Sequence, residues 1–310
     1  MNKNFKQNNQ SMKVGLALGS GAARGLTHIG ALKAIEEKGI KISYISGTSI
    51  GALIGGAYAA GFSVEEIEKI ALQTDWKLMA KLFSPTLPLR SLVNTNYLSE
   101  FLNTLYGNKS FEDLTIPFSA VATDIQTGKM VVIEDGDLLT AVRASISMPL
   151  VFSPVTYRKY KLVDGGLVNP TPVEIVKNMK MDKVIAVNLR KFSTYIIDNE
   201  NEIKVLEVNS NINTLSLNEK MQYFIKHPQR FLSSGKNIET SNPKFWSTLY
   251  HMYIIVQVQI GDLNMQLAKP DVLIEPDTSD FKVFDFNKAK ELIEIGYLAA
   301  KEKLGSIDFV

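Results

Sequence analysis

The sequence predicts an α/β fold in which a mostly parallel sheet is covered by helices. Short apolar runs alternate with stretches whose apolar residues recur at helical spacing, a pattern typical of strand–helix–strand–helix units. Of the 310 residues, 45% are hydrophobic and 21% are charged, which suits a globular chain with a sizeable core. This composition excludes a disordered chain, a collagen and a coiled coil as the main architecture.

The first strand–helix unit is expected near the N-terminus. The apolar run Val14–Leu18 predicts a buried strand, and a glycine-rich loop at residues 19–25 follows it. Apolar residues from Leu26 to Ile35 then recur at helical spacing, and Gly39 is typical of the position just beyond a helix.

The second unit follows directly. A strand is expected at Ile42–Ser46, then the sequence Gly47-Thr48-Ser49-Ile50-Gly51, then a helix rich in glycine and alanine that ends at Gly61. Ser63-Val64-Glu65-Glu66 predicts a capping box at the start of the next helix.

The remaining elements are expected to complete the same sheet and its cover. Further strands are predicted at Pro117–Thr123, Lys129–Glu134, Tyr160–Val163, Lys183–Asn188 and Asp271–Ile274, and helices at Pro170–Asn178 and Phe286–Leu304. No linker divides the chain, so residues 13–310 are interpreted as one elaborated domain.

Two segments do not fit the alternating pattern. Residues 1–12 are rich in Asn, Gln and Lys and are interpreted as a disordered tail. Residues 191–250 are polar and lack a clean period, which indicates an insertion. One hypothesis is that this insertion forms a lid over a site. The apolar run from Trp246 to Val256 beside it is interpreted first as a core helix, with part of a lid as the alternative.

Charge and residue counts exclude several classes of function. Lys plus Arg is 34 and Asp plus Glu is 32, a balance that gives no electrostatic case for nucleic acid. There is no cysteine, so thiolate nucleophiles and Cys-based metal sites are excluded. No run of about 18 apolar residues is present, so no spanning helix is expected. The absence of a signal peptide favours the cytoplasm, and a peripheral contact with a membrane through apolar surface stays open.

The glycine-rich loop after the first strand is not a nucleotide-binding loop. Arg24 takes the position of the third glycine in the dinucleotide fingerprint, and no acidic residue ends the second strand to hold a ribose. No Gly-Lys-Ser/Thr follows the loop, which also excludes a phosphate loop. What remains is a run of backbone N–H groups at a helix N-terminus, which can bind an anion, including a transient oxyanion.

The second loop is a Gly-x-Ser-x-Gly sequence centred on Ser49. It lies between an apolar strand and a small-residue helix, the strand–elbow–helix arrangement in which Gly47 and Gly51 allow a sharp turn and the serine oxygen projects. The plainer interpretation is a glycine-rich turn with a capping serine.

A serine hydroxyl needs a base, and the three histidines do not offer an obvious one. His28 lies early in the first helix, His227 precedes a proline in the insertion, and His251 lies in an apolar run; each is interpreted as structural. A carboxylate is the alternative base. Asp164 stands at the end of a predicted strand before Gly165-Gly166, where α/β sheets gather catalytic groups, although a turn aspartate would look the same.

The order of these pieces resembles the patatin-like phospholipase family in its bacterial single-domain form. The resemblance rests on the Arg24-Gly25 loop, the Gly-x-Ser-x-Gly sequence and Asp164-Gly165-Gly166, and three further stretches support it. These are Gly25–Leu32, Ala122–Gly128 and Arg143–Pro149. The detailed likeness covers roughly residues 13–190, and residues 191–250 match nothing in the family.

The resemblance implies a three-layer α/β/α sandwich and a Ser-Asp dyad. Carried over by position, Ser49 is the nucleophile and Asp164 the base. Backbone amides near Gly21, Ala22 and Ala23 would form the oxyanion hole, and Arg24 would hold the loop. The family loop is usually richer in glycine, and Ala22 would be strained if its position needs a positive φ.

The resemblance implies a lipid acyl hydrolase of the phospholipase A or lysophospholipase type, acting on an acyl-ester substrate without a metal or other cofactor. The principal alternative is an acyltransferase acting on acyl thioesters or lipids, although such enzymes normally place histidine beside the serine, where this chain has Thr48. A nucleotide-binding protein and a catalytically silent interaction protein are further alternatives. The sequence carries no signal for an oligomeric state.

Overall fold

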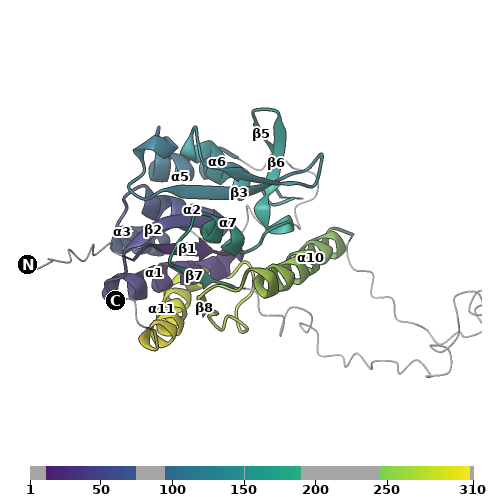
Figure 1. Ribbon diagram of the computed structural model, residues 1–310. Coiled ribbons are helices and arrows are strands. Elements are labelled where there is room, and N and C mark those ends of the chain that lie inside the picture. Colours follow the sequence, from purple (N-terminus) through teal and green to yellow (C-terminus); the bar gives the residue numbers. More distant parts are fainter. Residues whose placement is uncertain (1–11, 75–94, 150, 190–244, 308–310) are drawn as a thin grey trace, which may run out of the picture. The chain divides into compact units, whose positions relative to one another are not determined.

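The computed structural model describes residues 12–74, 95–149, 151–189 and 245–307 (Figure 1). Contacts divide the chain into two units, one of Met1–Ser193 with Phe245–Val310 and one of Thr194–Lys244. The predicted tail at residues 1–12, His227 and most of the predicted insertion at residues 191–250 lie outside the described residues.

Eight strands of the described residues form one sheet. They are β1 (Val14–Leu18), β2 (Ile42–Thr48), β3 (Phe118–Asp124), β4 (Met130–Ile133), β5 (Val155–Tyr157), β6 (Tyr160–Asp164), β7 (Lys183–Val187) and β8 (Val272–Ile274). Pairing runs β5-β6-β3-β2-β1-β7-β8, and β4 also pairs with β3. The pairs β3-β2, β2-β1, β1-β7 and β7-β8 are parallel, whereas the pairs β3-β4, β3-β6 and β5-β6 are antiparallel.

Helices cover both faces of the sheet (Figure 1). The α-helices are α1 (Thr27–Glu37), α2 (Ile50–Ala59), α3 (Val64–Gln73), α5 (Thr95–Tyr106), α6 (Leu138–Ser145), α7 (Val173–Asn178), α10 (Phe245–Ala268) and α11 (Ala289–Gly305). Four 3₁₀ turns join them: η1 (Ala22–Leu26), η2 (Phe111–Asp113), η3 (Gly165–Leu167) and η5 (Phe286–Lys288). The predicted α/β fold is confirmed.

The alternation of side chains along β1 shows how the core is divided. Every residue of β1 is buried, as expected for a central parallel strand. Ala17 packs with Val173 and Val176 of α7 on one face of the sheet. Leu18 lies on the other face, against Gly55 of α2. The sheet is therefore the middle of three layers.

Local signals in the sequence place the ends of the first helices. Gly39 has a φ of +72° just beyond α1, a conformation that glycine adopts without steric cost. The capping box predicted at the start of α3 is present, because Ser63 Oγ accepts from the Glu66 amide and the Glu66 carboxylate accepts from the Ser63 amide.

The helix predicted at Pro170–Asn178 begins later, at Val173. The preceding residues have other partners, since the Pro170 carbonyl accepts from the Ser20 amide and the Thr171 hydroxyl donates to Asn188. These hydrogen bonds connect Pro170 to the glycine-rich loop and Thr171 to Asn188, the residue that follows β7.

The register around β3 brings two strand ends together. β4 pairs with residues 120–123 of β3, overlapping the stretches used by β2 (118–121) and by β6 (122–124). Because a strand has only two sides, β2 and β6 must share the side that β4 leaves. They meet end to end there: Thr48 pairs with Val121, and Asp164 pairs with Ala122.

Candidate active site

Ser49 occupies a sharp turn between β2 and α2. Its φ of 57° and ψ of −122° lie outside the regions that most non-glycine residues adopt. Such a conformation costs roughly 1–3 kcal/mol and persists only where the surroundings enforce it. The serine is nearly buried, with 8% of its surface exposed. This strained turn is the elbow predicted from the Gly-x-Ser-x-Gly sequence.

The two glycines of the elbow are required for space. A Cβ on Gly47 would lie 2.4 Å from the Gly51 carbonyl oxygen, and one on Gly51 would lie 2.2 Å from the Leu18 carbonyl oxygen. Neither glycine has a positive φ, so the conformational strain falls on Ser49 itself. The glycines allow β1, β2 and α2 to approach closely enough to form the turn.

The Ser49 hydroxyl is hydrogen-bonded to the Asp164 carboxylate. The distance from Ser49 Oγ to Asp164 Oδ2 is 2.6 Å, and only 1% of the aspartate surface is exposed. The end-to-end meeting of β2 and β6 accounts for this contact, because each residue lies where its own strand stops. The structure therefore brings together two side chains that lie 115 positions apart in the sequence.

Hydrogen bonds from neighbouring segments fix the position of Asp164. Its Oδ1 accepts from the Gly166 amide at 2.7 Å, which leaves Oδ2 for Ser49. The Asp164 amide donates to the Ser147 carbonyl, and the Asp164 carbonyl accepts from the Thr123 hydroxyl. Gly165 has no space for a side chain, since a Cβ would lie 2.3 Å from the Val121 carbonyl oxygen. The carboxylate thus has little freedom to turn.

The glycine-rich loop is held by backbone bonds to distant parts of the chain. The Gly19 amide donates to Val187, and the Ser20 amide donates to Pro170. The Ala23 amide donates to the Val283 carbonyl at 3.0 Å, so one of the three amides expected in an oxyanion hole already has a partner. Among the described residues, the amides of Gly21 and Ala22 make no backbone or side-chain hydrogen bond. Of the three amides expected to form the oxyanion hole, only those of Gly21 and Ala22 are therefore without another partner among the described residues.

Ala22 adopts the strained conformation that the sequence raised as a difficulty. Its φ is 49°, in the left-handed region. A single non-glycine residue there costs about 1–2 kcal/mol, so the loop tolerates alanine at a modest energetic cost.

Arg24 and His28 anchor this loop through buried side chains. Arg24 is 5% exposed, and its guanidinium donates twice to the Phe281 carbonyl, at 2.9 and 2.5 Å. His28 Nε2 lies 2.7 Å from the Gly19 carbonyl oxygen and donates to it, since a carbonyl can only accept. Burial lowers the pKa of His28 to about 4, and the bond to Gly19 offsets this only in part. The imidazole is neutral and structural.

His251 lies on an exposed part of α10. Within the described ranges, no group of three or more His, Asp or Glu side chains could hold a metal ion.

Residues 16–177 match a family model described as patatin-like phospholipase. The chain belongs to the patatin-like phospholipase family. The resemblance predicted from the ordered motifs is thus confirmed, and the matched range contains both Ser49 and Asp164.

Two relatives are matched over only part of their length. An uncharacterized NTE family protein of Mycobacterium tuberculosis is 37% identical over 179 residues, which cover 58% of this chain and 49% of that protein. The patatin-like phospholipase domain-containing protein 6 of Homo sapiens is 36% identical over 183 residues, covering 57% of this chain and 13% of that protein. The chain thus spans about half the length of the mycobacterial relative, given that coverage of 49%.

Among solved structures, VipD from Legionella pneumophila has 13% sequence identity and a TM-score of 0.48, covering 96% of this chain and 67% of that one.

One residue of this patatin-like site was not recognised as functional from the sequence. Ser145 Oγ accepts from the Ser49 amide at 2.9 Å and donates to the Val121 carbonyl at 2.6 Å. It therefore ties the elbow to β3 at the point where β2 ends. The family-like stretch Arg143–Pro149 contains this serine, but nothing in the stretch indicates which strand it contacts.

Proposed function

We propose that the protein is a serine acyl hydrolase acting on lipid esters, with Ser49 as nucleophile and Asp164 as general base. The observation that carries the proposal is the 2.6 Å hydrogen bond between the Ser49 hydroxyl and the Asp164 carboxylate. A nucleophile and base within hydrogen-bond reach, with the base oriented by a third group, is the arrangement that covalent catalysis requires. The Gly166 amide is the third group here.

Acylation begins when Asp164 Oδ2 takes the hydroxyl proton as Ser49 Oγ attacks the ester carbonyl carbon. The carbonyl oxygen then carries a negative charge in the tetrahedral intermediate. When the intermediate collapses, the bond to the alcohol oxygen breaks, and the alcohol leaves with the proton from Asp164. Ser49 is left as an acyl ester.

The amides of Gly21 and Ala22 are assigned to the oxyanion. Both amides lack another hydrogen-bond partner among the described residues, and both lie at the N-terminal end of η1, which leads into α1. Removing one donor of such a hole typically lowers kcat by about 10²–10³. Arg24 and His28 are positioning residues for the loop, since their side chains contact backbone carbonyls within the protein.

Deacylation repeats the first step with water in place of the serine hydroxyl. Asp164 takes a proton from water, water attacks the acyl carbon, and the Ser49 oxygen leaves with that proton. Acyl transfer to another alcohol would use the same intermediate, and the products distinguish the two reactions.

Labelling with a fluorophosphonate tests the nucleophile directly. We expect covalent modification at Ser49 in the wild-type protein and none in Ser49→Ala, with hydrolysis of p-nitrophenyl esters falling by about 10³-fold or more in the variant. Ser119→Ala is the matched control, because Ser119 is buried on β3 and donates to the Ser46 hydroxyl rather than to Asp164. Native rates in Ser49→Ala would refute the assignment.

A peripheral contact with a lipid surface is also proposed, through α10. Asp262 is the only Asp, Glu, Lys or Arg in this 24-residue helix. Exposed apolar side chains lie along it: Met252, Ile255, Val256, Leu263 and Leu267. α10 contacts η3, the turn that follows Asp164, so the helix as a whole lies close to the proposed site. No described helix is both long and apolar enough to cross a bilayer.

Sedimentation with phosphatidylcholine vesicles tests this contact. Leu263→Lys with Leu267→Lys should lower the bound fraction several-fold, because two exposed apolar side chains are lost. Leu298→Lys on α11, which is 54% exposed, is the matched control and should bind as wild type. Equal binding by all three proteins would remove α10 from the proposal.

A further inference from the structure

Helix α10 packs on the segment that follows the proposed base. Three of its residues at helical spacing, Gln257, Gly261 and Asn264, face residues 166–170. Asn264 Nδ2 donates to the Val168 carbonyl at 3.3 Å. The same segment also accepts one hydrogen bond from the elbow and one from the glycine-rich loop. One face of α10 therefore packs on the segment to which the base, the elbow and the glycine-rich loop are all joined.

Gln257 lies against Gly166, the residue whose amide orients the base. Only 1% of the glutamine surface is exposed. A Cβ placed on Gly166 would lie 2.4 Å from Gln257 Nε2 and 3.0 Å from Asp164 Oδ1, so both atoms border the same small space. This carboxylate oxygen is the one that accepts from the Gly166 amide. The side-chain amide of Gln257 therefore lies beside the oxygen that faces Gly166, while the other oxygen faces Ser49.

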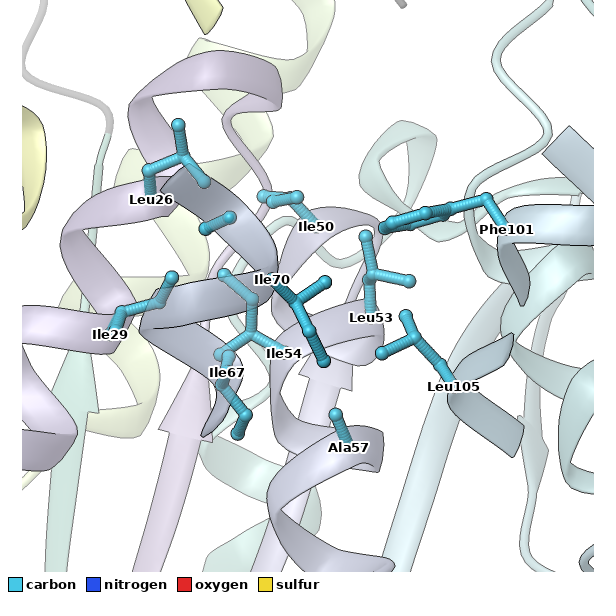
Figure 2. A pocket seen from close by; sticks show the side chains of 11 residues that line it. Leu26, Ile29, Ile50, Leu53, Ile54, Ala57, Ile67, Ile70, Phe101 and Leu105 are labelled. Atoms are coloured by element: carbon cyan, nitrogen blue, oxygen red, sulfur yellow. The ribbon is translucent and has the colours of Figure 1, made fainter. Parts of the chain in front are cut away.

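Packing alone does not account for the polar end of Gln257. Its Oε1 is buried and makes no hydrogen bond with the described residues. A buried acceptor without a donor destabilises the folded state relative to an apolar group of the same shape. Around α2, the helix that follows Ser49, the space between η1, α1, α2, α3 and α5 is lined only by Ala, Leu, Ile and Phe side chains (Figure 2). Helices can thus pack close to the elbow through apolar side chains, and an amide at Gln257 requires another reason.

We infer that Gln257 is a positioning residue for the general base: its side-chain amide holds the Gly166 amide and the Asp164 carboxylate in the orientation that Ser49 requires. The inference rests on the proposed function, since it needs Asp164 as the base. An amide nitrogen carries N–H donors, which are attracted to a carboxylate oxygen. A displacement of a reacting group by about 1 Å can lower the rate by about 10²-fold.

This role belongs to a part of the chain that the family model does not cover. The match to the patatin-like phospholipase family ends at residue 177, and Gln257 lies 80 positions beyond it. The family resemblance therefore gives no signal for this residue, and α10 supplies it from the C-terminal side of residues 190–244.

An apolar side chain of similar length separates positioning from packing. Gln257→Met should lower kcat for p-nitrophenyl butyrate by about tenfold or more with KM unchanged, because the base acts in the transition state and not in substrate binding. Its free energy of unfolding should equal or exceed that of wild type, since a buried acceptor without a donor is removed. Gln259→Met makes the same change at an exposed position of the same helix and should leave kcat, KM and stability unchanged.

Three results with Gln257→Met would overturn the inference. An unchanged kcat would show that the amide does not act on the base. A loss of stability in parallel with kcat would assign Gln257 to packing, and a raised KM at unchanged kcat would assign it to substrate binding.

A double-mutant cycle with Gly166 tests the placement without relying on activity. Gly166→Ala should lower the free energy of unfolding, because the added Cβ would overlap Gln257 Nε2. The same substitution should cost less in a Gln257→Ala background, where that atom is absent. Urea unfolding of the four proteins measures both costs. Equal costs would mean that Gln257 does not lie against Gly166 and would overturn the inference.

The positioning role and the proposed function fail in different ways. If Ser49→Ala abolishes hydrolysis while Gln257→Met hydrolyses at the wild-type rate, the function stands and the role of Gln257 is wrong. If Ser49→Ala hydrolyses at the wild-type rate, the proposed function is wrong, and the role of Gln257 is wrong with it.

Discussion

The loops after β1 and β2 both lead from a parallel strand towards a helix, yet they are held in different ways. Each contains one non-glycine residue at positive φ, Ala22 at 49° and Ser49 at 57°. The β1 loop is fixed by backbone hydrogen bonds to remote segments and by the side chains of Arg24 and His28. The elbow after β2 is fixed by close steric contact at its glycines, by the Ser145 hydroxyl that accepts from the Ser49 amide, and by the Thr48 hydroxyl that donates to the Asn169 carbonyl.

The two loops are fixed differently because they present different groups to the proposed site. The β1 loop offers backbone amides, so its geometry is set by neighbours that bind the other backbone groups and leave two amides without partners. The elbow offers one side chain, so a strained backbone at a single residue is sufficient, provided that the helix and strands cannot relax. Substitutions in either loop therefore separate the two ways of holding a loop in place.

The largest effect is expected at the base that faces the elbow. Asp164→Asn keeps an oxygen for the Gly166 amide but removes the proton acceptor for Ser49, so kcat should fall by about 10³–10⁴ with the fold retained. Steady-state hydrolysis and circular dichroism measure the two quantities. Asp124→Asn is the matched control, since its carboxylate caps a turn by accepting from Thr127 and its loss should leave kcat unchanged.

The next prediction concerns the free energy of unfolding at low pH, which depends on His28 beside the β1 loop. The pKa of His28 is about 4 in the folded protein and near 6.5 when unfolded, so the unfolded chain binds a proton that the folded chain does not between these values. The free energy of unfolding is therefore unaffected by His28 above pH 6.5 and falls by up to about 3 kcal/mol as the pH drops to 4.

Urea unfolding of wild type and His28→Gln across this range measures the effect. The variant should be less stable at pH 7, because the bond to Gly19 is altered, but it should lose less stability on acidification. Parallel curves for the two proteins would contradict a neutral, buried His28.

Much of this fold and part of this site could be predicted from the sequence alone. Gly39 and the Ser63–Glu66 capping box mark helix ends through local chemistry, and Ser49 lies in a motif whose glycines sit within two residues of it. These features depend on residues that are close together in the sequence, so they can be predicted from it.

Contacts that depend on sheet register were not predictable in the same way. The meeting of Ser49 and Asp164 requires β2 and β6 to share one side of β3, and the sequence does not encode that pairing locally. Likewise, the partner of the Ala23 amide is Val283, which approaches only after the C-terminal segment has packed. Family resemblance supplied Asp164, whereas it did not distinguish Ala23 from Gly21 and Ala22.

The smallest effect compares one glycine from each loop. A Cβ on Gly51 would lie 2.2 Å from the Leu18 carbonyl oxygen, which is backbone and cannot move alone, whereas one on Gly21 would lie 2.7 Å from Cδ1 of Leu189, the end of a flexible side chain. Gly51→Ala should therefore lower the free energy of unfolding by about 2 kcal/mol or more, and Gly21→Ala by less than about 1 kcal/mol. Urea unfolding of both variants at pH 7 measures this difference. Equal losses would mean that the β1 loop is as sterically constrained as the elbow, and the contrast between backbone-bonded and close-packed loops would not hold.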